Sequence, residues 1–201
     1  HELFTVWQDF DADPGLMVAI LTGAGDRAFS TGNDLKYSAS LASTGQRSIT
    51  PPLGGFGGLT NPRFEIWKPI IAAVNGYAMG GGLELALACD LLIASDHAQF
   101  ALPEPKVGLV AGAGGMHRLP RQLPFKIAMG MLLTGKRLSA EDAYRLGLAN
   151  EVVPLQELLP TAERWAKEVI ECAPLAIRGS KQAALTGMHL PLESAINNKY
   201  S

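Results

Sequence analysis

The stretch "KPIIAAVNGYAMGGGLELALACDLLIAS", residues 68–95, decides the fold of this 201-residue chain. It opens with the short apolar run 68–76, passes through consecutive glycines at 80–82, and ends in a second apolar run, 91–95. Short apolar runs bounded by turn residues are typical of buried strands, and residues 83–90 between these two runs have helical character. The stretch therefore predicts a buried strand, a helix and another buried strand in succession.

The same alternation extends upstream, and helices follow downstream. "GLMVAILTG" (15–23) is another short apolar run that predicts a buried strand. Beyond residue 115 the patterns are mainly helical, and Ser139, followed by Glu141 and Asp142, predicts a helix start. Strands that alternate with helices early, followed by helices alone, predict an α/β body with a helical tail.

The composition excludes several classes of partner. The chain is 47% hydrophobic with a net charge of −2, which gives no electrostatic reason to expect nucleic acid or an anionic membrane. No apolar run approaches the ~20 residues of a membrane span. The cysteine and histidine spacing does not match a metal site. The two cysteines predict free thiols in a reducing compartment, hence a cytoplasmic protein, or a mitochondrial or peroxisomal one in a eukaryote, and not a secreted one.

The glycines at 80–82 have three possible purposes. The first N–H groups of a helix lack helical partners, so bare backbone there can cradle a phosphate or stabilise an oxyanion. Close packing of the helix on a strand is the third interpretation. The phosphate-binding patterns GxxxxGK[ST] and GxGxxG are absent, but the glycines alone do not choose between the other two.

A second glycine-containing turn favours the oxyanion interpretation. "RAFSTGNDLK" (27–36) directly follows the first predicted strand, as "GGGLE" (80–84) follows the next. Turns at the ends of neighbouring strands could aim two N–H groups at one point, which is the geometry that an oxyanion needs.

With both turns in view, the chain resembles the crotonase (enoyl-CoA hydratase/isomerase) superfamily. The resemblance rests on four blocks in the family's order, 28–36, 68–95, 98–121 and 133–154. It implies an α/β fold, a crotonase-type spiral of β-β-α units with a C-terminal helical oligomerisation region. The implied division is a spiral core over 1–133 and a helical trimerisation region over 134–201. The family's first strand with its hairpin, and its last helices, are expected to be missing from this chain.

The resemblance also implies a substrate and a binding site. Family members act on acyl thioesters of coenzyme A, which enters as part of the substrate, so no separate cofactor is expected. They assemble as homotrimers or as hexamers built from two trimers. The oxyanion donors would be the backbone N–H groups of Asn33 and Gly81. The positions that would line the substrate and its CoA are Ala28, Ser30, Gly32, Asp34, Leu35, Lys36, Gly80 and Gly112.

Two glutamates match those that the family's hydratases use. Glu84 and Glu104 lie 20 residues apart, as in the hydratase pattern. Two carboxylates in one site repel, so one tends to keep its proton while the other ionises. By the resemblance, Glu84 would orient and deprotonate the attacking water, and Glu104 would protonate the α-carbon.

Other functions remain open from the sequence. Isomerases of the superfamily usually keep one catalytic carboxylate, and some share the "GNDL" turn (32–35). "GGFGGLT" (54–60) with "FALPEPKVGL" (100–109) resembles carnitinyl-CoA dehydratases. Two further possibilities are an inactive scaffold, which the retained glutamates disfavour, and an RNA-binding protein, which the acidic balance disfavours.

Overall fold

The computed structural model describes residues 2–34, 53–61 and 63–198. Within them the strands form two four-stranded sheets. Sheet A has the order β1 (Ala19–Thr22), β3 (Ile70–Val74), β5 (Leu91–Ser95) and β8 (Glu151–Val153). Sheet B has the order β2 (Ala28–Ser30), β4 (Tyr77–Met79), β6 (Gln99–Ala101) and β7 (Leu138–Ser139). All pairs are parallel except β6 with β7.

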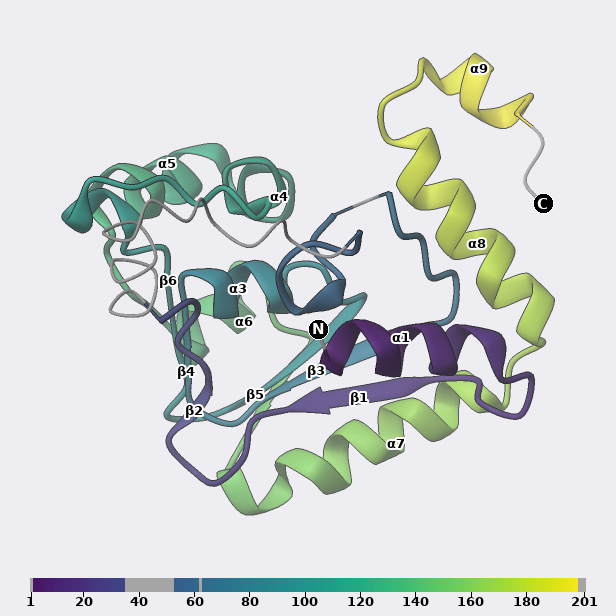
Figure 1. The fold of residues 1–201 in the computed structure, drawn as a ribbon, viewed down its shortest axis with the longest axis horizontal. Helices are drawn as coiled ribbons and strands as arrows, with labels where there is room; N and C mark the ends of the chain where they lie inside the picture. Colours follow the sequence, from purple (N-terminus) through teal and green to yellow (C-terminus); the bar gives the residue numbers. More distant parts are fainter. Residues whose placement is uncertain (1, 35–52, 62, 199–201) are drawn as a thin grey trace, which may run out of the picture.

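The chain winds as a spiral that adds one strand to each sheet per turn. The strand pairs β1–β2, β3–β4 and β5–β6 each place their first member in sheet A and their second in sheet B. Figure 1 shows sheet A running through the lower body, with the strands of sheet B at its left end. Because the pairs stack in parallel, the segments that follow β2, β4 and β6 all leave sheet B at the same edge.

Helices follow the turns of the spiral and then dominate. They are α1 (Glu2–Ala12), α3 (Gly81–Ala86), α4 (Gly115–Gln122), α5 (Phe125–Thr134), α6 (Ala140–Arg145), α7 (Leu158–Ile170), α8 (Pro174–Gly187) and α9 (Leu192–Ile196), with 3₁₀ turns η1 (Phe56–Gly58), η2 (Glu104–Val107) and η3 (Leu155–Glu157). Ser139 caps α6 by accepting a hydrogen bond from the Asp142 N–H, which confirms the predicted helix start. The α/β class is confirmed as well.

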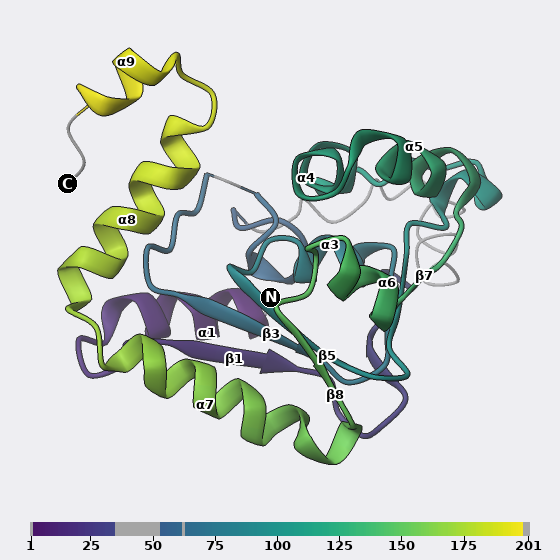
Figure 2. The ribbon, with the colours of Figure 1, turned by 180° about the vertical axis from the view of Figure 1, so that it is seen from behind.

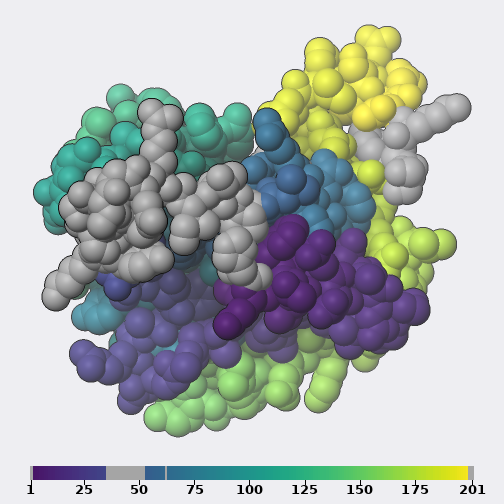
Figure 3. All heavy atoms as spheres, in the orientation of Figure 1, coloured from purple at the N-terminus to yellow at the C-terminus, as the bar shows by residue number. Residues whose placement is uncertain are grey.

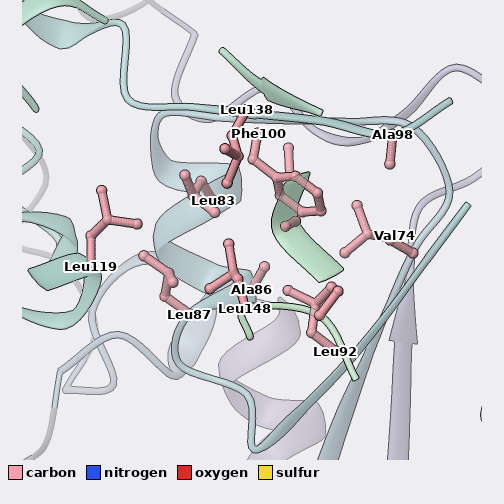
Figure 4. Packing of buried hydrophobic residues seen from close by; sticks show 14 of the residues in the cluster. Val74, Leu83, Ala86, Leu87, Leu92, Ala98, Phe100, Leu119, Leu138 and Leu148 are labelled. Atoms are coloured by element: carbon pink, nitrogen blue, oxygen red, sulfur yellow. The ribbon is translucent and has the colours of Figure 1, made fainter. Parts of the chain in front are cut away.

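Sheet A is covered on both faces, which explains its continuous apolar runs. All five residues of β3 are buried. Ile71 and Ala73 pack against α7, whereas Ala72 and Val74 face the central core between the sheets and α3. Figure 4 shows Val74 in this core with Leu83, Leu92 and Phe100. A strand buried on both faces shows no apolar–polar alternation, as expected for a parallel sheet.

The prediction that the two glycine turns directly follow the strands of sheet A is wrong. Each turn is separated from them by a short strand of sheet B, β2 in one case and β4 in the other. These strands have three residues each, too few to show an alternating pattern. Because β2 and β4 pair with each other in parallel, the two turns still come out at the same edge.

Residues beyond 134 contribute to the body and also project from it. β7 and β8 extend the two sheets, and α7 covers sheet A. In contrast, α8 and α9 rise away from the sheets in both ribbon views (Figures 1 and 2) and expose apolar side chains, namely Leu175, Leu185, Met188, Leu192 and Ile196. None of the described helices is both long and apolar enough to cross a bilayer.

Candidate active site

The three glycines at 80–82 each lie against a different neighbour. Gly80 has φ +55°, and a β-carbon there would lie 2.8 Å from Oε1 of Glu104. A β-carbon on Gly81 would lie 3.0 Å from the ring of Phe56. A β-carbon on Gly82 would lie 2.0 Å from the carbonyl oxygen of Ser30. Close packing of α3 on β2 is therefore confirmed at Gly82, while Gly80 and Gly81 leave backbone open beside a carboxyl group and an aromatic ring.

The turn after β2 meets the start of α3. Gly32 has φ +84°, and a β-carbon there would lie 2.9 Å from the Gly81 nitrogen and 3.1 Å from the Met79 oxygen. As the first residue of α3, Gly81 has no helical partner for its N–H. Asn33 follows Gly32 directly and is exposed. The structure thus brings together the two segments that carry the predicted oxyanion donors.

Glu84 is buried against the start of α4. Its side chain is 3% exposed, and its Oε1 accepts a hydrogen bond of 2.8 Å from the Gly115 N–H. A β-carbon on Gly115 would lie 3.0 Å from Cγ of Glu84, so any larger residue would push against the Glu84 side chain. The Ala113 N–H and the charge of Arg118 also favour the ionised form of Glu84. Glu84 is held as a hydrogen-bonded carboxylate, not as a solvated residue of a helix start.

Glu104 occupies different surroundings. It begins η2, directly after β6 and Pro103. Its Oε1 lies beside Gly80, and its Oε2 is buried with no hydrogen-bond partner among the described residues. A buried carboxyl oxygen without a partner favours the protonated acid, because ionisation there would leave a desolvated charge.

The two carboxyl groups influence each other's ionisation. Burial raises the pKa of both above the usual value for glutamate, and the charge of Glu104 raises the pKa of Glu84 further. Main-chain hydrogen bonds and Arg118 oppose this rise at Glu84, whereas only its own backbone N–H does so at Glu104. Like charges in one site lose their protons in two steps. The hydrogen bond from Gly115 at Glu84 and the unpartnered Oε2 of Glu104 are the geometric reasons to place the negative charge on Glu84, whereas the burial of Glu84 and the charge of Glu104 act in the opposite direction.

The remaining predicted residues that the structure describes come from β2, from the turn that follows it and from the turn before α4. Ser30 is half-buried, and its Oγ accepts a 3.3 Å hydrogen bond from the Gly32 N–H. Ala28 begins β2, at the end of that strand remote from Gly32. Asp34 is exposed beside Asn33, and Gly112 is exposed in the turn before α4. Leu35 and Lys36 lie outside the described residues.

Three contacts at the candidate site were not predicted from the sequence. The Gly115 amide binds Glu84 across 31 residues of chain. The Phe56 ring packs on Gly81, and Arg118 bonds to the carbonyl of Thr60. The "GAGG" pattern at 112–115 was a visible signal for the first contact, but its partner depends on the fold. Among the described residues no three His, Cys, Asp or Glu side chains are grouped so that they could share a metal ion.

The comparisons with known proteins agree along nearly the whole chain. The family model described as enoyl-CoA hydratase/isomerase matches residues 1–200. The (E)-benzylidenesuccinyl-CoA hydratase of Thauera aromatica is 46% identical over 199 residues, which are 97% of this chain and 75% of that protein. The carnitinyl-CoA dehydratase of Proteus mirabilis is 46% identical over 193 residues, or 96% of this chain and 72% of that protein.

Solved structures give the same result for the fold. An enoyl-CoA hydratase of Mycobacterium marinum matches with a TM-score of 0.87 at 40% identity, covering 97% of this chain and 74% of that one. A carnitinyl-CoA hydratase of Mycobacterium avium matches with a TM-score of 0.82 at 44% identity, covering 91% of this chain and 69% of that one. The expected crotonase-type fold is confirmed, and the chain belongs to the enoyl-CoA hydratase/isomerase family.

Proposed function

We propose that this protein is a hydro-lyase that reversibly adds water to the double bond of a 2-enoyl-CoA thioester. Two carboxyl groups in unlike surroundings, next to glycine backbone at the start of α3, give the strongest support for this proposal. The hydratases and dehydratases among its relatives support the same reaction type. Coenzyme A arrives as part of the thioester, so the proposed reaction uses no separate cofactor.

The proposed mechanism assigns one role to each group. The thioester oxygen accepts hydrogen bonds from the N–H groups of Asn33 and Gly81, which stabilise the negative charge that develops there. Ionised Glu84 takes a proton from water as its oxygen bonds to the β-carbon, and the electron pair of the double bond moves toward the α-carbon. Protonated Glu104 then gives its proton to the α-carbon. Water is added in full, and the two carboxyl groups regain their starting states by exchanging protons with solvent.

The other predicted residues are proposed to bind the substrate. Gly32 and Gly80 leave room for the thioester beside the two carboxyl groups. Ala28, Ser30, Asp34 and Gly112 are proposed to line the bound substrate and its CoA, together with Leu35 and Lys36. We expect them to affect KM more than kcat, because none of them is assigned a proton transfer.

Carnitinyl-CoA dehydratase activity is the second candidate. It is favoured by relatives of that name at 46–47% identity, which cover 96% of this chain. An isomerase is a weaker candidate, because this chain has two interacting carboxyl groups, Glu84 and Glu104, where isomerases of the superfamily usually keep one. The three activities differ in their products, so a single set of assays separates them.

The proposed assembly is a homotrimer or a hexamer of two trimers. The exposed apolar side chains of α8 and α9 support it, because such surfaces on a projecting element mark protein contacts. Light scattering on the purified protein tests it, and a monomer at micromolar concentration would contradict it. We expect no nucleic acid or membrane partner and propose a cytoplasmic location, consistent with two unpaired cysteines.

The decisive test measures hydration of a panel of 2-enoyl-CoA thioesters and of crotonobetainyl-CoA, alongside isomerisation of a 3-enoyl-CoA. Glu84→Gln and Glu104→Gln are each expected to lower kcat by about 100-fold or more, the lower end for general acid–base groups. Glu141→Gln, an exposed glutamate on α6, is the matched control and should leave kcat unchanged. Isomerisation without hydration, or full activity in both variants, would overturn the proposal.

A further inference from the structure

The glycine-rich loop 53–61 is a tightly built segment that lies beside the candidate active site. The Asn61 N–H donates to the Gly54 oxygen at 2.9 Å, and the Gly58 N–H donates to the Gly55 oxygen at 3.1 Å. From α1, the Trp7 indole donates to the Gly57 oxygen at 2.8 Å. Figure 3 shows the blue surface of this part of the chain against the purple surface of α1. The loop is therefore anchored on one side by α1, a helix that is distant from Glu84 in the sequence.

Arg118 anchors the loop on the other side. Its Nη1 donates to the Thr60 oxygen at 2.9 Å and to the Ala113 oxygen at 3.4 Å. It also lies over Gly114, where a β-carbon would be 2.1 Å from Nη1 and where φ is +108°. One guanidinium thus joins the loop to the turn whose next residue, Gly115, binds Glu84.

The charge of Arg118 acts on Glu84 without pairing with it. Arg118 forms no ion pair with any of the described carboxylates, and its hydrogen bonds go to main-chain oxygens. Its charge favours the ionised form of Glu84, and the charge of Glu84 in turn stabilises the guanidinium against burial. The other ionisable groups nearby are Glu104 from η2, which repels Glu84, and Cys89, whose burial raises its pKa to about 12 and keeps it neutral.

We propose that Arg118 is a positioning residue that, through its bonds to the Thr60 and Ala113 oxygens, holds the Gly114–Gly115 turn so that the Gly115 amide stays on the Glu84 carboxyl group. This inference rests on the proposed function, in which Glu84 must be ionised to activate water. Arg118 itself donates to main-chain oxygens of the protein and is assigned no contact with substrate. It links three elements that are distant in sequence, the loop 53–61, the turn before α4 and helix α3.

The test is the pH profile of kcat/KM for hydration by the full-length protein, with Arg118→Gln, Arg118→Met and Arg118→Lys. Arg118→Gln removes the anchor of the turn, which weakens the Gly115 hydrogen bond to Glu84, and also removes a positive charge, so the acid limb of the profile should move to higher pH. This variant should also have a lower kcat with little change in KM. Arg118→Lys keeps the positive charge but cannot reproduce the bonds to both the Thr60 and the Ala113 oxygen. The acid limb of its pH profile should therefore lie at the wild-type pH, whereas its kcat should be only partly recovered.

Controls separate this proposal from simple destabilisation. Arg121→Gln is the matched control, because Arg121 is an exposed arginine on the same helix whose Nη1 bonds to the His117 oxygen. It should match the wild type in kcat and in the acid limb. If Arg118→Gln does not fold, Arg118→Met makes the same test. If neither folds, Arg118→Lys must still show a lower kcat than the wild type, with the acid limb of its pH profile at the wild-type position.

The outcomes distinguish the two proposals. A wild-type protein without hydration activity would refute the proposed function. If the wild type is active, two results would overturn the role of Arg118 but leave the proposed function standing. One is an acid limb of the pH profile that is the same in Arg118→Gln and Arg118→Met as in the wild type. The other is a kcat and an acid limb in Arg118→Lys that are no closer to the wild type than those of Arg118→Gln. An equal shift in Arg121→Gln would also overturn the role of Arg118, since the effect would then be one of net charge.

Discussion

Replacing Gly82 by alanine tests whether close packing of α3 on β2 positions the site. A β-carbon at 82 would lie 2.0 Å from the Ser30 oxygen, 2.6 Å from its carbonyl carbon and 2.9 Å from its Cβ. Real β-carbon contacts essentially never fall under 3.0 Å. The shortest contact is therefore short by at least 3.0 − 2.0 = 1.0 Å. Because backbone atoms cannot rotate out of the way, α3 and β2 must separate.

That separation affects both stability and activity. Overpacking of this kind typically costs about 1–3 kcal/mol, which for a chain of this size lowers Tm by roughly 2–12 °C. Glu84 and Gly81 move with α3, whereas Gly32 and Asn33 follow β2. A misplacement of about 1 Å between reacting groups can cost about 100-fold in rate, so we expect a loss of that order in kcat for a 2-enoyl-CoA.

Gly130→Ala is the matched control. Gly130 lies inside α5 with nothing within 4 Å of its β-carbon position. Alanine should therefore stabilise the helix by about 1 kcal/mol, raising Tm by roughly 2–4 °C without changing kcat. Thermal unfolding and initial hydration rates measure both effects. A Gly82→Ala protein with the Tm and kcat of the wild type would refute the reasoning, as would equal damage from Gly130→Ala.

Three further predictions concern contacts outside the two carboxyl groups. Lys181→Met removes the 2.7 Å ion pair that ties α8 to Asp90, so amide exchange in α8 should quicken and Tm should fall; unchanged exchange would show that α8 is held by other contacts. Iodoacetamide at pH 8 should modify exposed Cys172 but not Cys89, whose burial raises its pKa to about 12; mass spectrometry checks this, and early labelling of Cys89 would contradict it. Trp7→Phe leaves the Gly57 oxygen without its indole donor, which should lower stability by about 1–3 kcal/mol and speed amide exchange in the loop 53–61; a denaturation curve matching the wild type would argue against a structural role for this bond.

Much of the fold could be predicted from local sequence. The apolar runs that became β1, β3 and β5 have five to nine residues and are bounded by turn residues, so they stand out without any tertiary knowledge. Ser139 caps α6 because a serine oxygen three residues before the Asp142 N–H is a local geometry. The strands β2, β4, β7 and β8 were not predicted, because segments of two or three residues carry no periodicity to read.

The candidate site likewise has features that the sequence shows and features that only the fold shows. The residue types and spacing of Glu84 and Glu104, with the glycines beside them, are properties of the sequence and identify the family. The sequence could not show which carboxyl group is hydrogen-bonded, since the Gly115 amide that binds Glu84 lies 31 residues away. Nor could it show that Arg118 spans 58 residues to reach Thr60. Strand and helix patterns arise between near neighbours and are encoded locally, whereas burial and long-range hydrogen bonds exist only once the spiral has wound distant segments together.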